Sequence, residues 1–298
     1  MRHFLSELDL TQEEFLSIIR RGSEFRQAFE KGITEALLPR RVLGMIFEKS
    51  STRTRVSFEA GMTQLGGHAI YLSPNDTQLG RGETLTDTAN VLSQMLDIVM
   101  VRTFSHEALE QFTQSCTIPV INGLTDLLHP CQLLADMQTY ADYRGSIEGK
   151  TVAYVGDGNN MCHSYMNTAA LLNFQLRIAC PEKYSPEAAI RSSTQANIEY
   201  CHSPMDACDG ADLVVTDVWS SMGQEAEQAE REQAFQNYCI TEQHMAAAHK
   251  DALFMHCLPA HRGEEVSAEV IDGPQSVVWD EAGNRLHSQK ALIEFLLK

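Results

Sequence analysis

The chain has 298 residues, with 40 acidic and 23 basic side chains, a formal net charge of −17, and 43% hydrophobic residues. This length predicts one large or two medium globular domains, and such an acidic balance argues against nucleic-acid binding, which needs Lys and Arg to neutralise phosphates. Apolar runs fall short of the roughly 20 residues that span a bilayer, and the acidic start is unlike a secretory signal, so we expect a cytoplasmic protein that binds neither membranes nor nucleic acid.

Short β-branched runs alternate with amphipathic stretches in the first half of the chain. The expected strands are 42–47, 68–73, 97–103 and 118–123. The expected helices between them are 53–66, 84–95 and 106–115. This alternation is typical of a parallel sheet that is covered by helices on both faces.

The second half repeats the pattern. The expected strands are 151–157, 176–181, 212–219 and 252–259, and the expected helices are 161–173, 185–197 and 224–237. A long helix over 130–148 bridges the halves, and two more helices are expected at 11–29 and 285–297. The sequence therefore predicts an α/β fold of two domains, each a mostly parallel sheet flanked by helices and joined by a long helix.

Polar side chains follow most of the expected strands. In open α/β sheets, ligands bind beyond the carboxyl ends of the strands. The polar segments at these ends are 51–55, Arg102, 129–132, 156–160, 217–223 and 256–259. We expect these segments to form two half-sites that face a shared cleft.

The segment Ser51-Thr52-Arg53-Thr54-Arg55 joins the first expected strand to a helix. Ser and Thr at a helix start can cap it. Arginine at that end opposes the helix dipole unless an anion offsets its charge. A phosphate at the helix N-terminus would use the hydroxyl, guanidinium and backbone donors together, whereas simple capping would use one or two hydroxyls.

Other common ligand motifs are weak in this chain. The eight cysteines form no CxxC pair and are expected to be reduced thiols. The nearest approach to a zinc pattern is Cys201-His202 with Cys208, so we expect no metal. A dinucleotide turn after 151–155 lacks its third glycine, where Met161 stands, and we expect no cofactor.

The sequences STRTR at 51–55, HPCQ at 129–132 and HCLP at 256–259 together resemble the aspartate/ornithine carbamoyltransferase family. SMG at 221–223, after Asp217, is similar to the ornithine-using branch, and the likeness extends to DEAGNR near the C-terminus. The resemblance implies transfer of the carbamoyl group from carbamoyl phosphate to the side-chain amine of L-ornithine, giving L-citrulline and phosphate. It also implies a carbamoyl phosphate-binding domain over 1–145, on which the C-terminal helix (282–298) packs back, and an ornithine-binding domain over 146–281.

The resemblance further implies roles for individual residues. The phosphate would be held by Ser51, Thr52, Arg53 and Thr54. The carbamoyl group would be contacted by Thr54, Arg102, His129, Gln132, Cys257, the Leu258 carbonyl and Arg285. The amino acid would be contacted by Asn160, Asp217, Ser221 and Met222, with Asp217 and Cys257 near its amines. Gln78 would reach the phosphate site of a neighbouring subunit, which implies a homotrimer with shared active sites.

Several of these residues also have plainer interpretations. His129 could pair with a helix N-terminus, and Gln132 could lie on the surface of the same helix. Cys257 could be a small buried side chain, or a nucleophile that forms a thiocarbamate. Arg285 could have no role beyond a surface ion pair with Asp280 or Glu281.

Three other functions remain open. A related carbamoyltransferase would use N-acetylornithine, N-succinylornithine, putrescine or lysine, and a carboxylate at Asp217 favours a free ammonium over an acylated one. A non-catalytic ligand-binding protein would not need Arg53, Arg102, His129, Gln132 and Cys257 together. A dinucleotide oxidoreductase would need the glycine that Met161 replaces.

Overall fold

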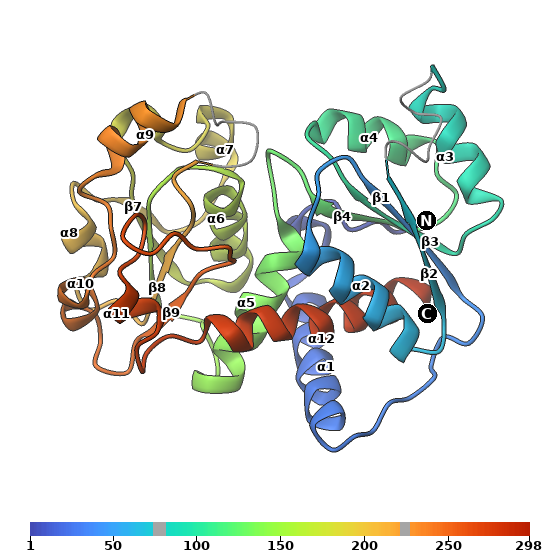
Figure 1. Cartoon of the computed structure of the whole chain (residues 1–298), viewed down its shortest axis with the longest axis horizontal. Helices are drawn as coiled ribbons and strands as arrows, with labels where there is room; N and C mark the ends of the chain where they lie inside the picture. The colour runs from blue at the N-terminus through green and yellow to red at the C-terminus, as the bar shows by residue number, and fades with distance from the viewer. Residues whose placement is uncertain (74–81, 221–226) are drawn as a thin grey trace. The chain divides into compact units, whose positions relative to one another are not determined.

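The computed structural model describes residues 1–73, 82–220 and 227–298. These residues form two compact units, of which the first comprises Met1–Gln138 with Gly283–Lys298, and the second comprises Thr139–Ala282 (Figure 1). Both divisions fall inside helices, one within α5 (Pro130–Arg144) and one within α12 (Val278–Leu297). The C-terminal helix therefore belongs largely to the first unit, as predicted.

The first unit contains a four-stranded sheet in the order β2-β1-β3-β4. Its strands are β1 (Val42–Phe47), β2 (His68–Leu72), β3 (Ile98–Arg102) and β4 (Val120–Leu124), and all pairs are parallel. The register between β3 and β4 shifts at Val101/Arg102, so Arg102 pairs with Leu124 beyond an irregularity in the ladder. Phe4 extends the sheet beyond β4 by a parallel bridge to Ile121.

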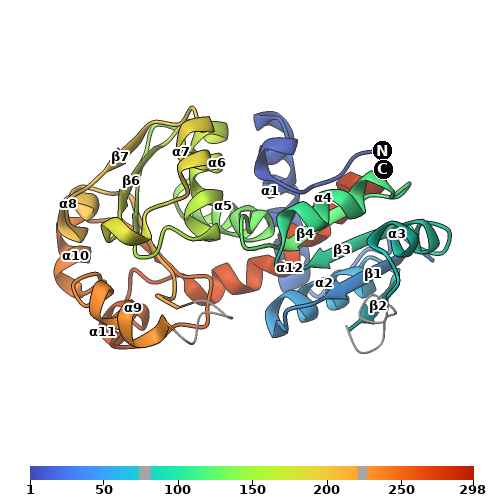
Figure 2. The ribbon, with the colours of Figure 1, turned by 90° about the horizontal axis from the view of Figure 1, so that it is seen from above.

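Helices cover both faces of this sheet (Figures 1 and 2). Helices α3 (Leu85–Ser93) and α4 (His106–Gln114) pack on one face, where Ala89 and Phe112 meet strand residues such as Val99. Helix α2 (Thr52–Gln64) joins β1 to β2 on the other face, together with α12. The long helix α1 (Gln12–Glu30) follows a one-turn helix, η1 (Glu7–Asp9). Helices α3 and α4 thus bury apolar side chains against the sheet.

Two glycines allow α12 to lie close to its neighbours. A β-carbon on Gly22 of α1 would stand 2.3 Å from Gln138 Oε1 and 3.3 Å from the Ser288 backbone. A β-carbon on Gly61 of α2 would stand 3.2 Å from the Lys290 side chain. Because glycine has no side chain, these helices can pack closely and hold the last helix within the first unit.

The second unit contains a five-stranded parallel sheet in the order β7-β6-β5-β8-β9. Its strands are β5 (Thr151–Val155), β6 (Gln175–Ala179), β7 (Ile198–Tyr200), β8 (Leu213–Thr216) and β9 (Leu253–Met255). Its helices are α6 (Asn160–Leu172), η3 (Glu182–Tyr184), α7 (Ala188–Ser193), α8 (Pro204–Cys208), α9 (Gln228–Phe235), α10 (Glu242–Ala247) and α11 (Ala268–Ile271). Val214, Phe254 and Ile240 lie in one fully buried core cluster of this unit.

The predicted fold class is confirmed, and the differences concern short elements. Strand β7 and helices α8, α10 and α11 span only three to six residues. Such segments are too short to show a period in the sequence. Helix α12 begins at Val278, before the predicted start at 285. The prediction missed its first turns because Asp280 and Glu281 interrupt the apolar pattern there. Of the helices that the structure describes, none is both long enough and apolar enough to span a membrane.

Candidate active site

The strand order reverses once in each unit. In the first unit the chain leaves β1 toward β2 in one direction, and β3 and β4 follow on the other side, so the reversal lies between β1 and β3. In the second unit the reversal lies between β5 and β8. Loops diverge at such points and leave a crevice beyond the strand ends, where ligands bind in open α/β sheets. The segments that follow these four strands contain most of the predicted site residues.

Helix α2 begins directly after β1. Ser51 is its N-cap and accepts a hydrogen bond from the Thr54 backbone N–H at 3.3 Å, and Thr52 is its first residue. The first turn holds no acidic side chain. Capping therefore accounts for the Ser51 hydroxyl.

The two arginines of this turn have different surroundings. Arg55 is exposed, pairs with Glu59 at 3.1 Å and stacks over the Tyr71 ring at 4.0 Å from its centroid. Arg53 is partly buried and is close enough to His129 to act on its charge. Only Arg53 therefore belongs with the other predicted site residues.

Thr54 is the point where two distant arginines meet. Its hydroxyl oxygen accepts from Arg102 Nη1 at 3.4 Å and from Arg285 Nη2 at 3.2 Å. All three side chains are buried, with exposed fractions of 1%, 5% and 2% respectively. A hydroxyl has two acceptor positions and one donor hydrogen, so these bonds direct the Thr54 hydrogen away from both guanidinium groups.

Arg285 comes from α12 and is buried, so the interpretation that places it on the surface is wrong. Its Nη1 donates to Gln132 Oε1 at 2.6 Å. Gln289 accepts from its Nε and Nη2, both at 3.0 Å, when its amide oxygen faces the guanidinium. Glu281 instead accepts from the His256 backbone N–H. The charge of Arg285 is thus held among uncharged oxygens of Thr54, Gln132 and Gln289.

Gln132 is 1% exposed, so the interpretation that places it on the surface is also wrong. Its Nε2 donates to Asp136 at 2.8 Å, and its Oε1 faces Arg285. The amide orientation is therefore set from both ends. A carbonyl oxygen can accept two hydrogen bonds.

His129 precedes Pro130, the first residue of α5, and its backbone carbonyl accepts from the Gln132 N–H at 3.0 Å. Burial lowers the pKa of His129 well below its usual range, and the charges of Arg285, Arg102 and Arg53 lower it further. The ring is therefore uncharged at neutral pH and carries one N–H donor. Three guanidinium groups and a neutral imidazole gather in one place, which is an arrangement that favours an anion.

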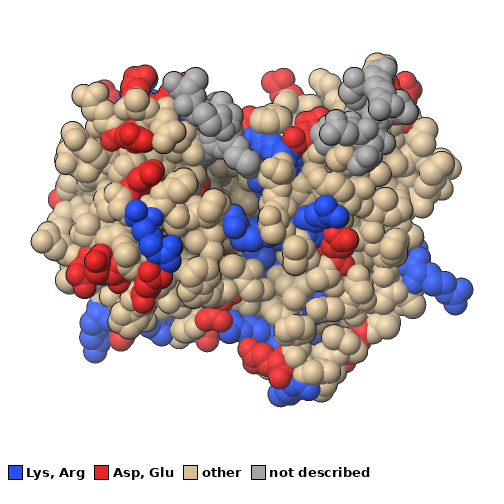
Figure 3. Space-filling model, viewed as in Figure 1, with Lys and Arg blue, Asp and Glu red and all other residues tan. Residues whose placement is uncertain are grey.

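Positive charge is concentrated there in a chain whose net charge is −17. On the face drawn in Figure 3, outside the grey residues, Lys and Arg side chains lie among Asp and Glu side chains. The attraction for an anion is therefore a local property of the Arg53, Arg102 and Arg285 cluster.

In the second unit, Asp217 follows β8 and is 6% exposed. Its Oδ1 accepts from the Val218 N–H at 2.9 Å and from Cys257 Sγ at 3.2 Å, and its Oδ2 accepts from Asn159 Nδ2 at 2.8 Å. A thiolate could not donate to the carboxylate, so the contact favours the thiol form of Cys257. Cys257 is therefore better placed to orient Asp217 than to act as a nucleophile.

Asn160 is the first residue of α6, and its neighbour Asn159 caps that helix. Asn159 Oδ1 accepts from the Met161 N–H at 2.9 Å and from the Tyr154 hydroxyl at 3.0 Å. Sequence reasoning chose Asn160 and missed Asn159, which links the helix cap to Asp217. The signal for it was present, since Asn is a favoured N-cap residue at a strand-to-helix junction.

A buried ion pair near the end of β5 was also missed. Arg231 of α9 donates from Nη1 to Asp157 Oδ2 and to the Trp219 carbonyl, both at 2.9 Å. Burial raises the pKa of Asp157 to about 6, against the opposing effect of Arg231. This pair fixes the loop after β5 to α9, but no local pattern in the sequence indicates it.

The His256-Cys257-Leu258-Pro259 turn follows β9. Leu258 has φ of +60°, in the left-handed region that non-glycine residues rarely occupy. Its N–H donates to His256 Nδ1 at 2.9 Å. His256 Nε2 lies 3.1 Å from Glu265 Oε1, and both side chains are fully buried. The turn is thus held from within the unit by two side chains that sequence reasoning had not assigned.

Three predicted site residues lie outside the described residues. They are Gln78, Ser221 and Met222. The others fall into two groups, one in each unit. The first group contains Ser51, Thr52, Arg53, Thr54, Arg102, His129, Gln132 and Arg285, and the second contains Asn160, Asp217, Cys257 and Leu258.

One group of potential metal ligands includes two residues of the second group, together with His256. Ligand atoms of Asp217, His256 and Cys257 lie within 4.8 Å of one another. Both ring nitrogens of His256 face other groups, namely the Leu258 N–H and Glu265. A metal ion would have to displace one of these hydrogen bonds.

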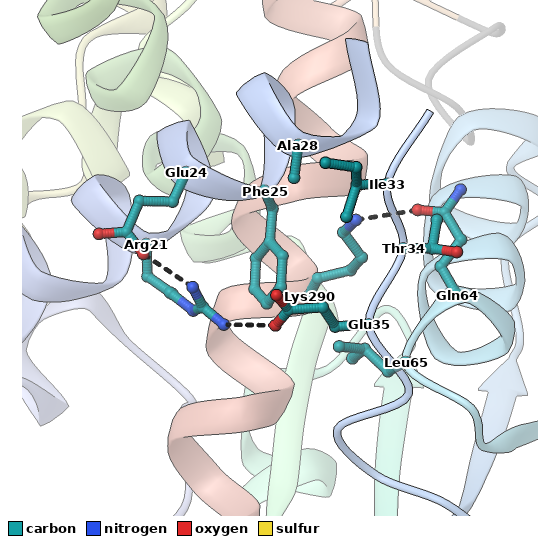
Figure 4. A pocket seen from close by; sticks show the side chains of 10 residues that line it. All are labelled: Arg21, Glu24, Phe25, Ala28, Ile33, Thr34, Glu35, Gln64, Leu65 and Lys290. Carbon is teal, nitrogen blue, oxygen red and sulfur yellow. Dashed lines mark hydrogen bonds and ion pairs between the residues drawn. The ribbon is translucent and has the colours of Figure 1, made fainter. Parts of the chain in front are cut away.

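A small pocket lies elsewhere in the first unit, lined from α1, α2, α12 and the segment after α1 (Figure 4). Lys290 points across it to Gln64 Oε1 at 2.9 Å and lies over the Phe25 ring, 4.7 Å from its centroid. Arg21 stacks on the same ring at 4.2 Å. The pocket contains none of the predicted site residues.

Burial, together with the charge of Arg21, lowers the pKa of Lys290 to about 8. A lysine whose pKa is lower in the folded than in the unfolded chain makes stability rise with pH between those two values. In the wild type, we expect the free energy of unfolding to rise by on the order of 1–2 kcal/mol between pH 8 and about 10.5, allowing for solvent screening. Lys290→Met should remove this rise. Urea unfolding at several pH values, with exposed Lys31→Met as control, checks this. Parallel profiles for the wild type and Lys290→Met would contradict it.

Two models of one protein family match this chain. The model of the aspartate/ornithine carbamoyltransferase carbamoyl-P binding domain matches residues 2–142, and that of the Asp/Orn binding domain matches residues 148–296. The ornithine carbamoyltransferase of Halorhodospira halophila is 60% identical over 297 residues, which cover 100% of this chain and 99% of that protein.

Solved structures agree with these matches. The ornithine carbamoyltransferase of Burkholderia thailandensis superposes with a TM-score of 0.90 at 50% identity, covering 100% of this chain and 99% of the other. That of Pyrococcus furiosus superposes with a TM-score of 0.94 at 46% identity, covering 99% and 97%. The two matched models together cover nearly the whole chain, so the chain belongs to the aspartate/ornithine carbamoyltransferase family.

Proposed function

We propose that this chain is an ornithine carbamoyltransferase, which transfers the carbamoyl group of carbamoyl phosphate to the side-chain amine of L-ornithine and releases L-citrulline and phosphate. The observation that carries the proposal is the cluster of Arg53, Arg102, Arg285 and uncharged His129 at the start of α2. The family and the names of its relatives supply the substrates.

The phosphate of the donor binds at the start of α2. Ser51, Thr52, Arg53 and Thr54 offer hydroxyl, backbone and guanidinium donors to its oxygens. The planar guanidinium of Arg53 can make two parallel bonds to phosphate, which lysine cannot. At about 1.5–3 kcal/mol for each charge-assisted bond, a few such contacts provide useful affinity after the cost of association.

The carbamoyl oxygen gains negative charge when the amine attacks the carbonyl carbon. Thr54, Arg102 and His129 donate to that oxygen, and Arg285 reaches the same end of the substrate. His129 suits this role because a neutral ring donates a hydrogen bond without repelling the arginines. Gln132 and the Leu258 carbonyl accept from the carbamoyl NH2 group. The carbon–oxygen bond to phosphate then breaks, and the amine loses a proton.

The amino acid binds in the second unit. Asp217 faces the α-ammonium group, with its carboxylate oriented by Asn159 and Cys257. Asn160, Ser221 and Met222 contact the rest of the amino acid. This charge arrangement favours ornithine over N-acetylornithine or N-succinylornithine, which lack the α-ammonium. No metal or cofactor takes part in this scheme.

A colorimetric assay for ureido products tests the proposal. The chain is incubated with carbamoyl phosphate and, in turn, with ornithine, N-acetylornithine, N-succinylornithine, putrescine and lysine. We expect ornithine to give the highest kcat/KM. A higher kcat/KM for an acylated amine or for putrescine would identify that amine as the substrate instead of ornithine. The absence of product with every amine would overturn the proposal.

The pH–rate profile should rise on the alkaline side. The attacking amine must lose its proton, and an unperturbed side-chain amine has a pKa of about 10.4. Because the pKa of His129 lies well below its usual range, His129 stays uncharged across this interval and adds no inflection. We expect kcat/KM for ornithine to rise about tenfold per pH unit from pH 6 toward 9. A flat profile would count against direct attack by the amine.

The same resemblance leads us to propose a cyclic homotrimer. In this arrangement Gln78 of one subunit completes the phosphate site of the next, so the trimer is the smallest active form. Light scattering on the purified chain measures its mass in solution.

A further inference from the structure

The left-handed conformation of Leu258 is restrained by a hydrogen bond within the second unit. A non-glycine residue with positive φ costs on the order of 1 kcal/mol or more, and it persists only where its surroundings hold it. The hydrogen bond from the Leu258 N–H to His256 Nδ1, at 2.9 Å, supplies that restraint.

The hydrogen bonds also define the tautomer of His256. Since Nδ1 accepts from a backbone N–H, it carries no hydrogen, and the ring hydrogen must be on Nε2. Nε2 then donates to Glu265 Oε1 at 3.1 Å. The same carboxylate oxygen accepts from the His261 N–H at 2.6 Å, so its position is fixed by the main chain. His256 and Glu265 are both fully buried, and solvent does not compete for these bonds.

We propose that His256, oriented by Glu265, is a positioning residue that keeps Leu258 left-handed and so sets the direction of the Leu258 carbonyl. This inference rests on the proposed function, in which the Leu258 carbonyl accepts from the carbamoyl NH2 group. His256 itself touches no substrate. It acts through the turn, much as an outer hydrogen bond fixes a catalytic group.

Two substitutions distinguish the contributions of the two ring nitrogens of His256. In His256→Asn, the amide oxygen stands near the place of Nδ1 and can still accept from the residue 258 N–H, as in an Asx turn. In His256→Gln, the amide nitrogen stands near the place of Nε2 and keeps the contact with Glu265, but the acceptor for Leu258 is lost. We expect His256→Gln to lower kcat by about tenfold or more and His256→Asn to retain kcat within about fivefold.

A glycine at 258 gives the sharper test. Glycine adopts positive φ without the cost that leucine incurs. We therefore expect His256→Gln to lower kcat by less than about threefold in a Leu258→Gly background, a coupling that a double-mutant cycle measures. The KM for carbamoyl phosphate should rise by a smaller factor than kcat falls, because the contacts to its phosphate lie in the first unit and are unchanged.

Equal losses of kcat in both backgrounds, or equal damage by Asn and Gln, would overturn the positioning role. Circular dichroism and thermal melting establish that each variant is folded. Should His256→Gln fail to fold, Glu265→Gln takes its place in the same cycle, with the same expected coupling to Leu258→Gly. The wild type is assayed first with ornithine: no citrulline from it would reject the proposed function, whereas an active wild type with uncoupled variants rejects only the role of His256.

Discussion

Replacing Arg53 with alanine is expected to weaken the binding of carbamoyl phosphate by at least about 100-fold. Arg53 lies in the first turn of α2 and acts on the charge of His129 together with Arg102 and Arg285. Losing two charge-assisted hydrogen bonds of about 1.5–3 kcal/mol each removes enough free energy for such a change. Isothermal titration calorimetry with carbamoyl phosphate, and with inorganic phosphate as a stable second ligand, measures it.

Arg55→Ala is the matched control. It removes the same charge two residues away, but Arg55 is exposed and engaged with Glu59 and the Tyr71 ring. We expect its affinity to stay within about threefold of the wild type, since surface charges contribute little. An affinity loss of similar size in both variants would mean that general charge attracts the phosphate. Near-normal affinity in Arg53→Ala would place the phosphate elsewhere.

Asp217→Asn should lower kcat/KM for ornithine by about 100- to 1000-fold, an effect typical of removing one charged contact to a reacting substrate. The asparagine loses the negative charge that faces the α-ammonium. It also sets an amide NH2 either against Asn159 Nδ2 or against the Cys257 thiol, both of which donate to Asp217 now. Carbamoyl phosphate affinity should change by less than about threefold, because its phosphate is held by residues of the first unit and Asp217 contacts only the amino acid.

Steady-state kinetics with each substrate varied in turn separates these effects. Asp206→Asn makes the same change on the exposed face of α8 and should leave both parameters near the wild-type values. If Asp217→Asn raised the KM of carbamoyl phosphate as much as that of ornithine, the division of substrates between the two units would be wrong.

The sequence by itself was enough to predict the alternation of strands and helices. Strand β1 was predicted over its observed bounds because it is a short continuous apolar run between polar segments. Helix α4 was predicted to within one residue because its nine residues show an amphipathic pattern. Parallel pairing then places every strand exit on one edge of its sheet. The sequence therefore indicated which polar segments gather in each unit, and motif resemblance identified them.

Contacts between distant residues were decided only by the tertiary structure. Arg285 reaches Thr54 across 231 positions and Gln132 across 153, and it does so because Gly22 and Gly61 let α12 pack tightly within the first unit. The His256–Glu265 and Asn159–Asp217 bonds likewise join segments that no periodicity connects. Local patterns encode which face of an element is apolar, whereas the partner of a buried polar group depends on how whole elements pack.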